Sequence, residues 1–81
     1  MFEQINDPIE VIASIGEGKI TPRKFLWRGR EFLVTAVNLS WSVWEGRSKL
    51  YYFAVSSDAN YFKLEFNSNK LVWVLLESQT D

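Results

Sequence analysis

The chain has 81 residues, a length that fits one small domain, and 47% of them are hydrophobic. Its formal net charge of −1 gives the whole chain no strong attraction to nucleic acid or to an anionic membrane surface. The sequence contains no cysteine and no histidine, which excludes disulfides, thiolate metal sites and the commonest general base. We therefore expect a cytoplasmic protein rather than a disulfide-stabilised secreted one.

No apolar run approaches the roughly 20 residues that a membrane-spanning helix requires. The first residues, MFEQINDP, lack the basic start and the apolar run of a signal peptide. We expect one soluble β domain over residues 1–81, with flexible ends at 1–7 and 77–81 and no membrane partner.

A row of alternating apolar residues predicts the first strand, at 9–15: Ile9, Val11, Ala13 and Ile15. The segment Gly16-Glu17-Gly18 then forms a turn. It is not a phosphate-binding loop, because neither the Lys-Ser/Thr signature nor a helix follows it.

Strands at 24–28 and 30–41 are predicted next, joined by a turn at Arg28 and Gly29. This register places Phe25 opposite Phe32 and Trp27 opposite Arg30. The apolar residues change face along 30–41, which predicts a bulge at Asn38. Residues 41–49 (WSVWEGRSK) are expected to form a loop or an irregular hairpin end, and three tryptophans are expected in the core: Trp41, Trp44 and Trp73.

Three more strands are predicted at 50–56, 61–67 and 70–76. A loop at 57–60 pairs Phe53 with Leu64, and a two-residue turn at Ser68 and Asn69 pairs Leu64 with Trp73. These three side chains then form one buried row. With no helical period in the sequence, we predict an all-β fold, a single small antiparallel curled sheet or barrel of about six strands, SH3-like or half-barrel.

The last predicted strand is apolar on both faces, because Val72, Val74 and Leu76 alternate with apolar neighbours. Either a second layer of the same chain or another copy must cover these residues, so a homodimer is expected if the sheet stays open.

The inventory of catalytic groups is small. The carboxylates are spread singly along the chain, and none resembles an acid/base pair or a metal-binding cluster. We expect no catalytic residue, no metal and no cofactor, and hence a protein that is not an enzyme.

One segment, 19–30, combines five cations with two aromatic residues and contains no acid. Such a combination can hold a phosphate backbone and stack a base. It can equally be structural, through cation–π contacts and through lysine stems that cover apolar surface. The candidate binding residues are Arg23, Lys24, Trp27, Arg28 and Arg30, and the candidate partners are nucleic acid, bound weakly, and an acidic protein.

The residues from Phe25 to Val34 (FLWRGREFLV), followed by Trp41, by 52–55 (YFAV) and by 73–75 (WVL), resemble a family of small uncharacterised bacterial domains. Its members share a phenylalanine before a Trp-Arg-Gly-Arg turn and spaced tryptophans. Some are encoded near, or fused to, DNA-damage polymerase-like proteins. The resemblance spans about residues 22–76, although the glycine expected at 58–60 is missing. It implies a bacterial origin and a link to nucleic-acid transactions, and no catalytic residue.

These observations favour a non-catalytic binding or accessory module. The alternative is a structural or assembly domain that homodimerises through an apolar sheet face.

Overall fold

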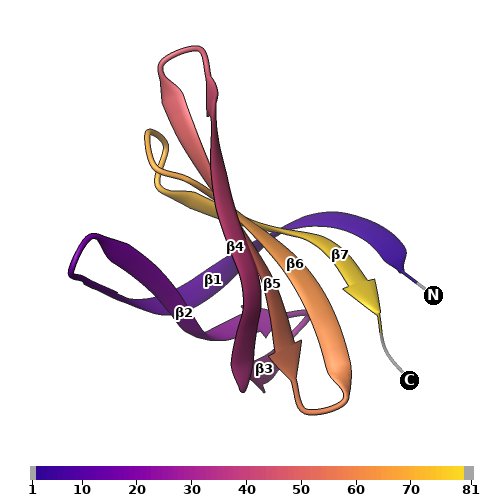
Figure 1. Cartoon of the computed structure of the whole chain (residues 1–81). Coiled ribbons are helices and arrows are strands. Elements are labelled where there is room, and N and C mark those ends of the chain that lie inside the picture. The colour runs from indigo at the N-terminus through magenta and orange to yellow at the C-terminus, as the bar shows by residue number, and fades with distance from the viewer. Residues whose placement is uncertain (1, 80–81) are drawn as a thin grey trace.

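A computed structural model describes residues 2–79, which form antiparallel strands and no helix. The strands are β1 (Glu3–Gly16), β2 (Lys19–Trp27), β3 (Arg30–Leu33), β4 (Ala36–Glu45), β5 (Ser48–Ser57), β6 (Asn60–Asn67) and β7 (Val72–Gln79). They make one sheet in the order β3-β2-β1-β7-β6-β5-β4, which curls into a half-barrel (Figure 1). The prediction of a small, curled, all-β antiparallel sheet is therefore confirmed. Within residues 2–79, no helix has the length and apolar character that a membrane crossing requires.

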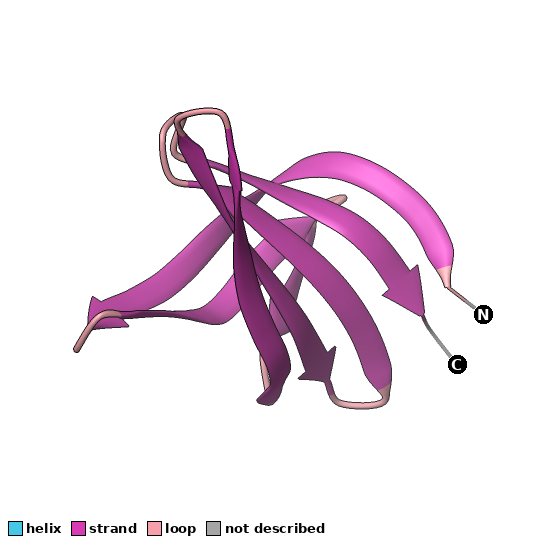
Figure 2. Ribbon diagram, turned by 45° about the horizontal axis from the view of Figure 1, so that its top comes forward, coloured by secondary structure: helices cyan, strands magenta, loops and turns pink. Residues whose placement is uncertain are grey.

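The half-barrel is closed at one end and open at the other. At the closed end, the short connection between β3 and β4 forms hydrogen bonds with both halves of the curled sheet. The N–H of Val34 donates to the carbonyl of Arg23 on β2, and the N–H of Thr35 donates to the carbonyl of Ser56 on β5, each at 2.8 Å. At the open end, the β1–β2 and β4–β5 hairpins project in different directions, as Figures 1 and 2 show.

The core lies on the concave face of the sheet and consists of side chains from alternate positions of the strands. Its buried members are Phe25, Phe32, Phe53, Val55, Phe62, Leu64 and Leu75. The rings of Phe25, Phe32 and Phe62 form a triangle with centroids 5.0–5.2 Å apart. Because β2 and β3 supply two of these rings and β6 supplies the third, the triangle joins the two halves of the curled sheet.

Several predicted registers are confirmed. Phe25 lies opposite Phe32, Trp27 opposite Arg30 and Phe53 opposite Leu64. The turn at Arg28 and Gly29 has positive φ angles of 52° and 75°, which suit a tight hairpin that follows the twist of its strands. The predicted bulge at Asn38 is also present, since the β4–β5 register shifts between Val37 and Leu39.

The single strand predicted at 30–41 is wrong. It is two strands, β3 and β4, because Val34 and Thr35 cross the opening between the sheet edges through their hydrogen bonds to β2 and β5. The sheet therefore has seven strands in the described part rather than six. Residues 41–49 are also regular, since β4 and β5 pair up to Glu45 and Ser48 and leave only a two-residue turn at Gly46 and Arg47.

Over residues 64–67 of β6, the predicted β6–β7 register is wrong by two residues. Leu64 faces Leu75, and Trp73 faces Phe66 instead. The turn spans residues 68–71, because the side chain of Asn67 accepts hydrogen bonds from the backbone N–H groups of Asn69 and Lys70, both at 3.0 Å. A shift of two keeps each side chain on its face, so Trp73 still packs against the core while Leu75 takes the buried position in the row.

One further expectation does not hold. Trp44 is 69% exposed and Trp41 36% exposed, because both lie on β4, at the edge of the sheet, and not in the core. Residues 3–7 are in β1 and residues 77–79 are in β7, and the expected flexibility of the two ends stays a prediction. Residues 1, 80 and 81 lie outside the described residues.

Candidate binding surfaces

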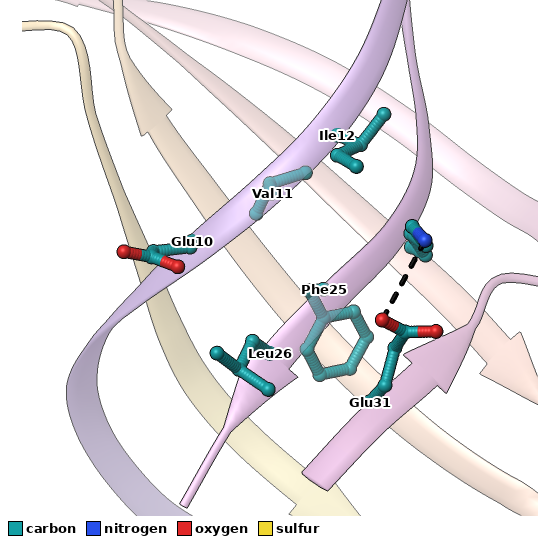
Figure 3. A pocket seen from close by; sticks show the side chains of 7 residues that line it. Glu10, Val11, Ile12, Phe25, Leu26 and Glu31 are labelled. Carbon is teal, nitrogen blue, oxygen red and sulfur yellow. Dashed lines mark ion pairs between the residues drawn. The ribbon is translucent and has the colours of Figure 1, made fainter. Parts of the chain in front are cut away.

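The five predicted binding residues do not share one surface. Arg23 and Lys24 lie on the outer side of β2, where Arg23 Nε donates to Ser14 Oγ at 3.0 Å. The Lys24 ammonium lies 3.5 Å from the Glu31 carboxylate (dashed line in Figure 3). Each of these two cations therefore already has a polar partner within the same half of the sheet.

Trp27 faces the opposite side and is half-buried. Its indole Nε1 donates to Asp7 Oδ2 at 2.9 Å, and its ring packs against Phe32 and Phe62 at centroid distances of 6.2 and 6.3 Å. The guanidinium of Arg28 lies over the same ring at 4.5 Å from its centroid and 3.7 Å from Asp7. These contacts hold the β2–β3 hairpin onto β1.

Arg30 also has an aromatic partner, because its guanidinium lies 5.1 Å from the ring centroid of Phe32. It does not form the pair with Glu10 or Glu65 that would make it a buried structural charge, as the salt bridges of residues 2–79 show. The binding role of the five residues stays a prediction. Their contacts give each of them a structural role that needs no ligand.

A hollow on the outer side of β1–β3 has a volume of about 180 Å³ (Figure 3). Glu10 and Glu31 lie at its two sides, with Val11, Ile12, Phe25 and Leu26 between them. Glu31 is neutralised by Lys24 and is 61% exposed, so the hollow has no buried charge directed into it. In the described residues, no group of three or more carboxylates is placed to hold a metal ion.

β4 is the most exposed strand of the sheet. All ten of its residues are exposed, including Val37, Leu39, Trp41, Val43 and Trp44. Among residues 2–79 its one ladder neighbour is β5, so its other edge is free. The opposite edge strand, β3, is short and carries Arg30 and Glu31, two features by which proteins protect an edge. β4 is ten residues long and carries a charge only at its last residue, Glu45.

The hairpin turn determines which backbone groups of β4 are free. In a two-residue hairpin, the residues flanking the turn exchange both ladder hydrogen bonds, and the pattern then alternates along the strand. Glu45 and Ser48 flank this turn, and their register continues without a shift to Leu39. The N–H and C=O groups of Ser40, Ser42 and Trp44 therefore point away from β5, towards the free edge.

A cleft lies beside this edge, at the open end of the half-barrel. We call it the mouth cleft; it has a volume of about 290 Å³ and is lined by Gly18, Lys19, Ile20, Ser40, Trp41, Ser42, Lys49, Tyr51 and Phe53. The β1–β2 hairpin provides one wall, and β4 and β5 provide the other. The Lys49 ammonium lies 5.1 Å from the Tyr51 ring centroid and 5.8 Å from that of Trp44, so aromatic faces hold it in place.

The outer face beyond β4 carries a second set of aromatic and charged contacts. Trp41 stacks on Tyr52 at 5.3 Å, and the ammonium of Lys63 lies 5.4 Å from the Trp41 ring centroid and 3.4 Å from Glu77. Burial, then the hydrogen bond and the charge of Glu65, raise the pKa of Tyr52 above 10.0. On the same face, Val72 is 42% exposed.

The sequence did not single out β4 as a binding surface, because its tryptophans were assigned to the core. One signal was available. Leu39, Trp41 and Val43 alternate with Ser40 and Ser42, the pattern of a strand with one apolar and one polar face.

A family described as "Domain of unknown function (DUF6504)" matches residues 1–80. The chain belongs to this family. The match is longer than the resemblance at 22–76 and covers every strand of the half-barrel. No curated protein matches the chain, and no solved structure does. The description of DUF6504 assigns no activity, so the function of this DUF6504 domain has to be inferred from its surfaces.

Proposed function

We propose that this DUF6504 domain is a non-catalytic binding module, and that β4 accepts an extended segment of a partner protein as an additional strand. The observation that carries the proposal is the free edge of β4, with ten exposed residues and outward-pointing backbone groups. Strand addition of this kind uses main-chain hydrogen bonds for affinity and side-chain pockets for specificity. β4 offers both, since the mouth cleft lies beside it.

The apolar side chains of β4 support the same interpretation. An exposed, long, apolar edge strand is an aggregation hazard unless something covers it. Leu39, Trp41 and Val43 would pack against the side chains of an added strand, because directly opposite residues on one face approach closely. A partner would therefore remove apolar surface from water as well as pair the backbone.

Nucleic acid is a weaker candidate for the partner. Single-strand binding needs aromatic faces on which bases can stack. Arg28 covers Trp27 and Lys49 lies against Tyr51, so a base would have to displace a cation. The resemblance to bacterial domains encoded near DNA-damage polymerase-like proteins supports an accessory role in the cytoplasm beside such proteins, with a protein contact as the means.

Selection from a displayed library of random peptides, each long enough to span β4, tests the proposal. Selected peptides should bind the domain and lose about tenfold in affinity with Ser42→Pro, which removes an outward N–H and places a ring at the edge. Ser42→Ala keeps that N–H and is the matched control, and circular dichroism confirms that both variants fold. If no peptide is selected, or if Ser42→Pro binds selected peptides as well as Ser42→Ala does, strand addition is wrong.

A second copy of the chain is the alternative occupant of the edge. In an antiparallel pair centred on Trp41, Leu39 of one copy would face Val43 of the other, so β4 is compatible with itself. Sedimentation velocity distinguishes the two cases. A mass that stays monomeric over the concentrations used for peptide binding supports a separate partner, and a dimer that Ser42→Pro dissociates would show that the domain is an assembly unit instead.

A further inference from the structure

The chemistry of the mouth cleft identifies the kind of segment that β4 would accept; this inference rests on the proposed strand addition. Lys19 is on the wall formed by the β1–β2 hairpin, and Lys49 is on the wall formed by β5. None of the lining residues carries a carboxylate. The salt bridges of residues 2–79 join other residues, so neither lysine has its charge paired within the described part.

The position of these two lysines relative to the β4 edge determines which side chains of an added strand would face them. Side chains of an added strand alternate between two faces. Those opposite Ser40 and Ser42 would point into the concave side, towards the cleft that these serines line. Those opposite Leu39, Trp41 and Val43 would lie on the outer face, beside apolar neighbours.

The floor of the cleft limits what can enter it. Phe53 is buried and Ile20 and Tyr51 are half-buried, so the floor is apolar. The rim includes Lys19 and Lys49, and the ammonium of Lys49 lies against the rings of Tyr51 and Trp44. A volume of about 290 Å³ admits a few side chains of an extended segment. A carboxylate on a Glu stem matches this arrangement, because its methylene groups would lie on the floor and its charge would reach the rim.

We propose that the mouth cleft selects an extended protein segment in which acidic residues alternate with apolar ones. The acidic side chains enter the cleft between Lys19 and Lys49, and the apolar side chains pack on Leu39, Trp41 and Val43. The backbone of the segment pairs with the outward groups of Ser40, Ser42 and Trp44.

The neighbouring acids do not cancel this preference. Glu17 and Glu45 are at the ends of the two hairpins, and neither belongs to the cleft lining. They lie along the chain beside the turns at Gly18 and Gly46. They would repel acidic residues at the ends of the segment, so the acidic positions should concentrate at its centre.

The experiment measures binding of three synthetic peptides by fluorescence anisotropy: one alternating Glu with Val, one alternating Lys with Val, and one with the Glu/Val composition in scrambled order. The unmodified domain should bind the alternating Glu peptide best, with an affinity that falls as salt rises. Lys19→Glu and Lys49→Glu should each lower the affinity for this peptide several-fold. An exposed ion pair changes affinity by roughly 1.4- to 5-fold, and reversal of the charge adds repulsion. Each reversed variant should bind the Lys peptide better than the unmodified domain does.

Arg23→Glu is the matched control. It makes the same charge change on the outer side of β2, away from the cleft lining, and should leave the affinity of the Glu peptide within about twofold. If Lys19→Glu, Lys49→Glu and Arg23→Glu all weaken binding of the Glu peptide equally, the affinity depends only on the net charge of the domain. This result would overturn the inference.

Other outcomes separate the two proposals. If selected peptides need the Ser42 N–H but show no preference for acid and no response to Lys19→Glu or Lys49→Glu, strand addition stands and the acidic specificity is wrong. If no peptide depends on Ser42, both proposals fail. A single-stranded oligonucleotide is tested as a competitor of the Glu peptide. If it displaces the peptide, and if Lys19→Glu or Lys49→Glu abolishes its binding, the cleft binds nucleic acid and the inference is overturned.

Discussion

The contact between Asp7 and Trp27 is a direct test of whether Trp27 is a structural residue. Trp27→Phe removes the indole N–H and keeps an aromatic ring against Phe32 and Phe62. Asp7→Ala removes the acceptor of the 2.9 Å hydrogen bond and also the partner of Arg28. The two substitutions and their combination form a double-mutant cycle that isolates the contact between the two side chains.

The expected losses in the free energy of unfolding depend on how exposed the Asp7 carboxylate is. A hydrogen bond to a charged group contributes roughly 1.5–3 kcal/mol. The Asp7 side chain is 39% exposed, so its carboxylate can be rehydrated once the donor is gone, and the lower end applies. We expect Trp27→Phe to cost about 1.5 kcal/mol. Asp7→Ala should cost about 2 kcal/mol, because it also loses an exposed ion pair that contributes roughly 0.2–1 kcal/mol.

Urea denaturation followed by tryptophan fluorescence measures these free energies, and thermal melting gives an independent check. For a domain of this size, each kcal/mol corresponds to a fall in melting temperature of roughly 4–8 °C. The coupling energy of the cycle should be about 1 kcal/mol. A coupling energy below about 0.3 kcal/mol, with Trp27→Phe close to neutral, would refute a structural role for Trp27. Trp27 would then again be a candidate ligand-binding residue.

Three further predictions concern the core, one turn and one tyrosine. Leu64 is fully buried, so Leu64→Ala should lower the free energy of unfolding by roughly 2–5 kcal/mol, measured by urea denaturation; a loss below about 1 kcal/mol would contradict the packing described. Leu71 has a φ of 58°, a conformation that costs a non-glycine residue roughly 1–2 kcal/mol, so Leu71→Gly should raise the melting temperature despite the flexibility of glycine; a lower one would contradict this. Tyr52 should titrate above 10.0 in the folded protein, so its stabilising contribution is present below pH 10.0 and is lost as the pH rises through the folded pKa. Glu65→Gln should lower that pKa in an absorbance titration, and an unchanged value would exclude Glu65 as a cause.

Local pairing was predictable from the sequence. The β2–β3 and β5–β6 hairpins have short turns, and the alternation of apolar residues leaves one register that buries them on both strands. The bulge at Asn38 was predictable for the same reason, because a change of apolar parity within one strand requires an extra residue.

Features that depend on distant contacts were not predictable. The break at Val34 and Thr35 contains no glycine or proline, and it exists because β2 and β5 supply hydrogen-bond acceptors on either side. The longer β6–β7 turn depends on the side chain of Asn67, which caps two backbone N–H groups. Composition and alternation carry no information about either contact.

The candidate site was predictable only in its chemistry. Cations and aromatic residues in 19–30 indicated an anionic partner, but which cations share a surface depends on the face of the strand. Lys19 lies at the mouth cleft with Lys49, a residue 30 positions away in the chain, while Arg23 and Lys24 lie on the outer side. The exposure of Trp41 depends on the order of the strands, which places β4 at an edge.

The pairing of β1 with β7 at the middle of the sheet has a consequence for how the chain folds during synthesis. Each half, β1–β3 and β4–β6, can form its hairpins as it emerges from the ribosome, because their pairings are local. Neither half can complete the aromatic triangle, since Phe25 and Phe32 come from one half and Phe62 from the other. The strand that joins the halves, β7, is the last to be made. We therefore expect the cooperative core to form after translation has passed Gln79. We also expect the junction of β7 with β1 to be the slow step of folding, because these strands are far apart in the sequence.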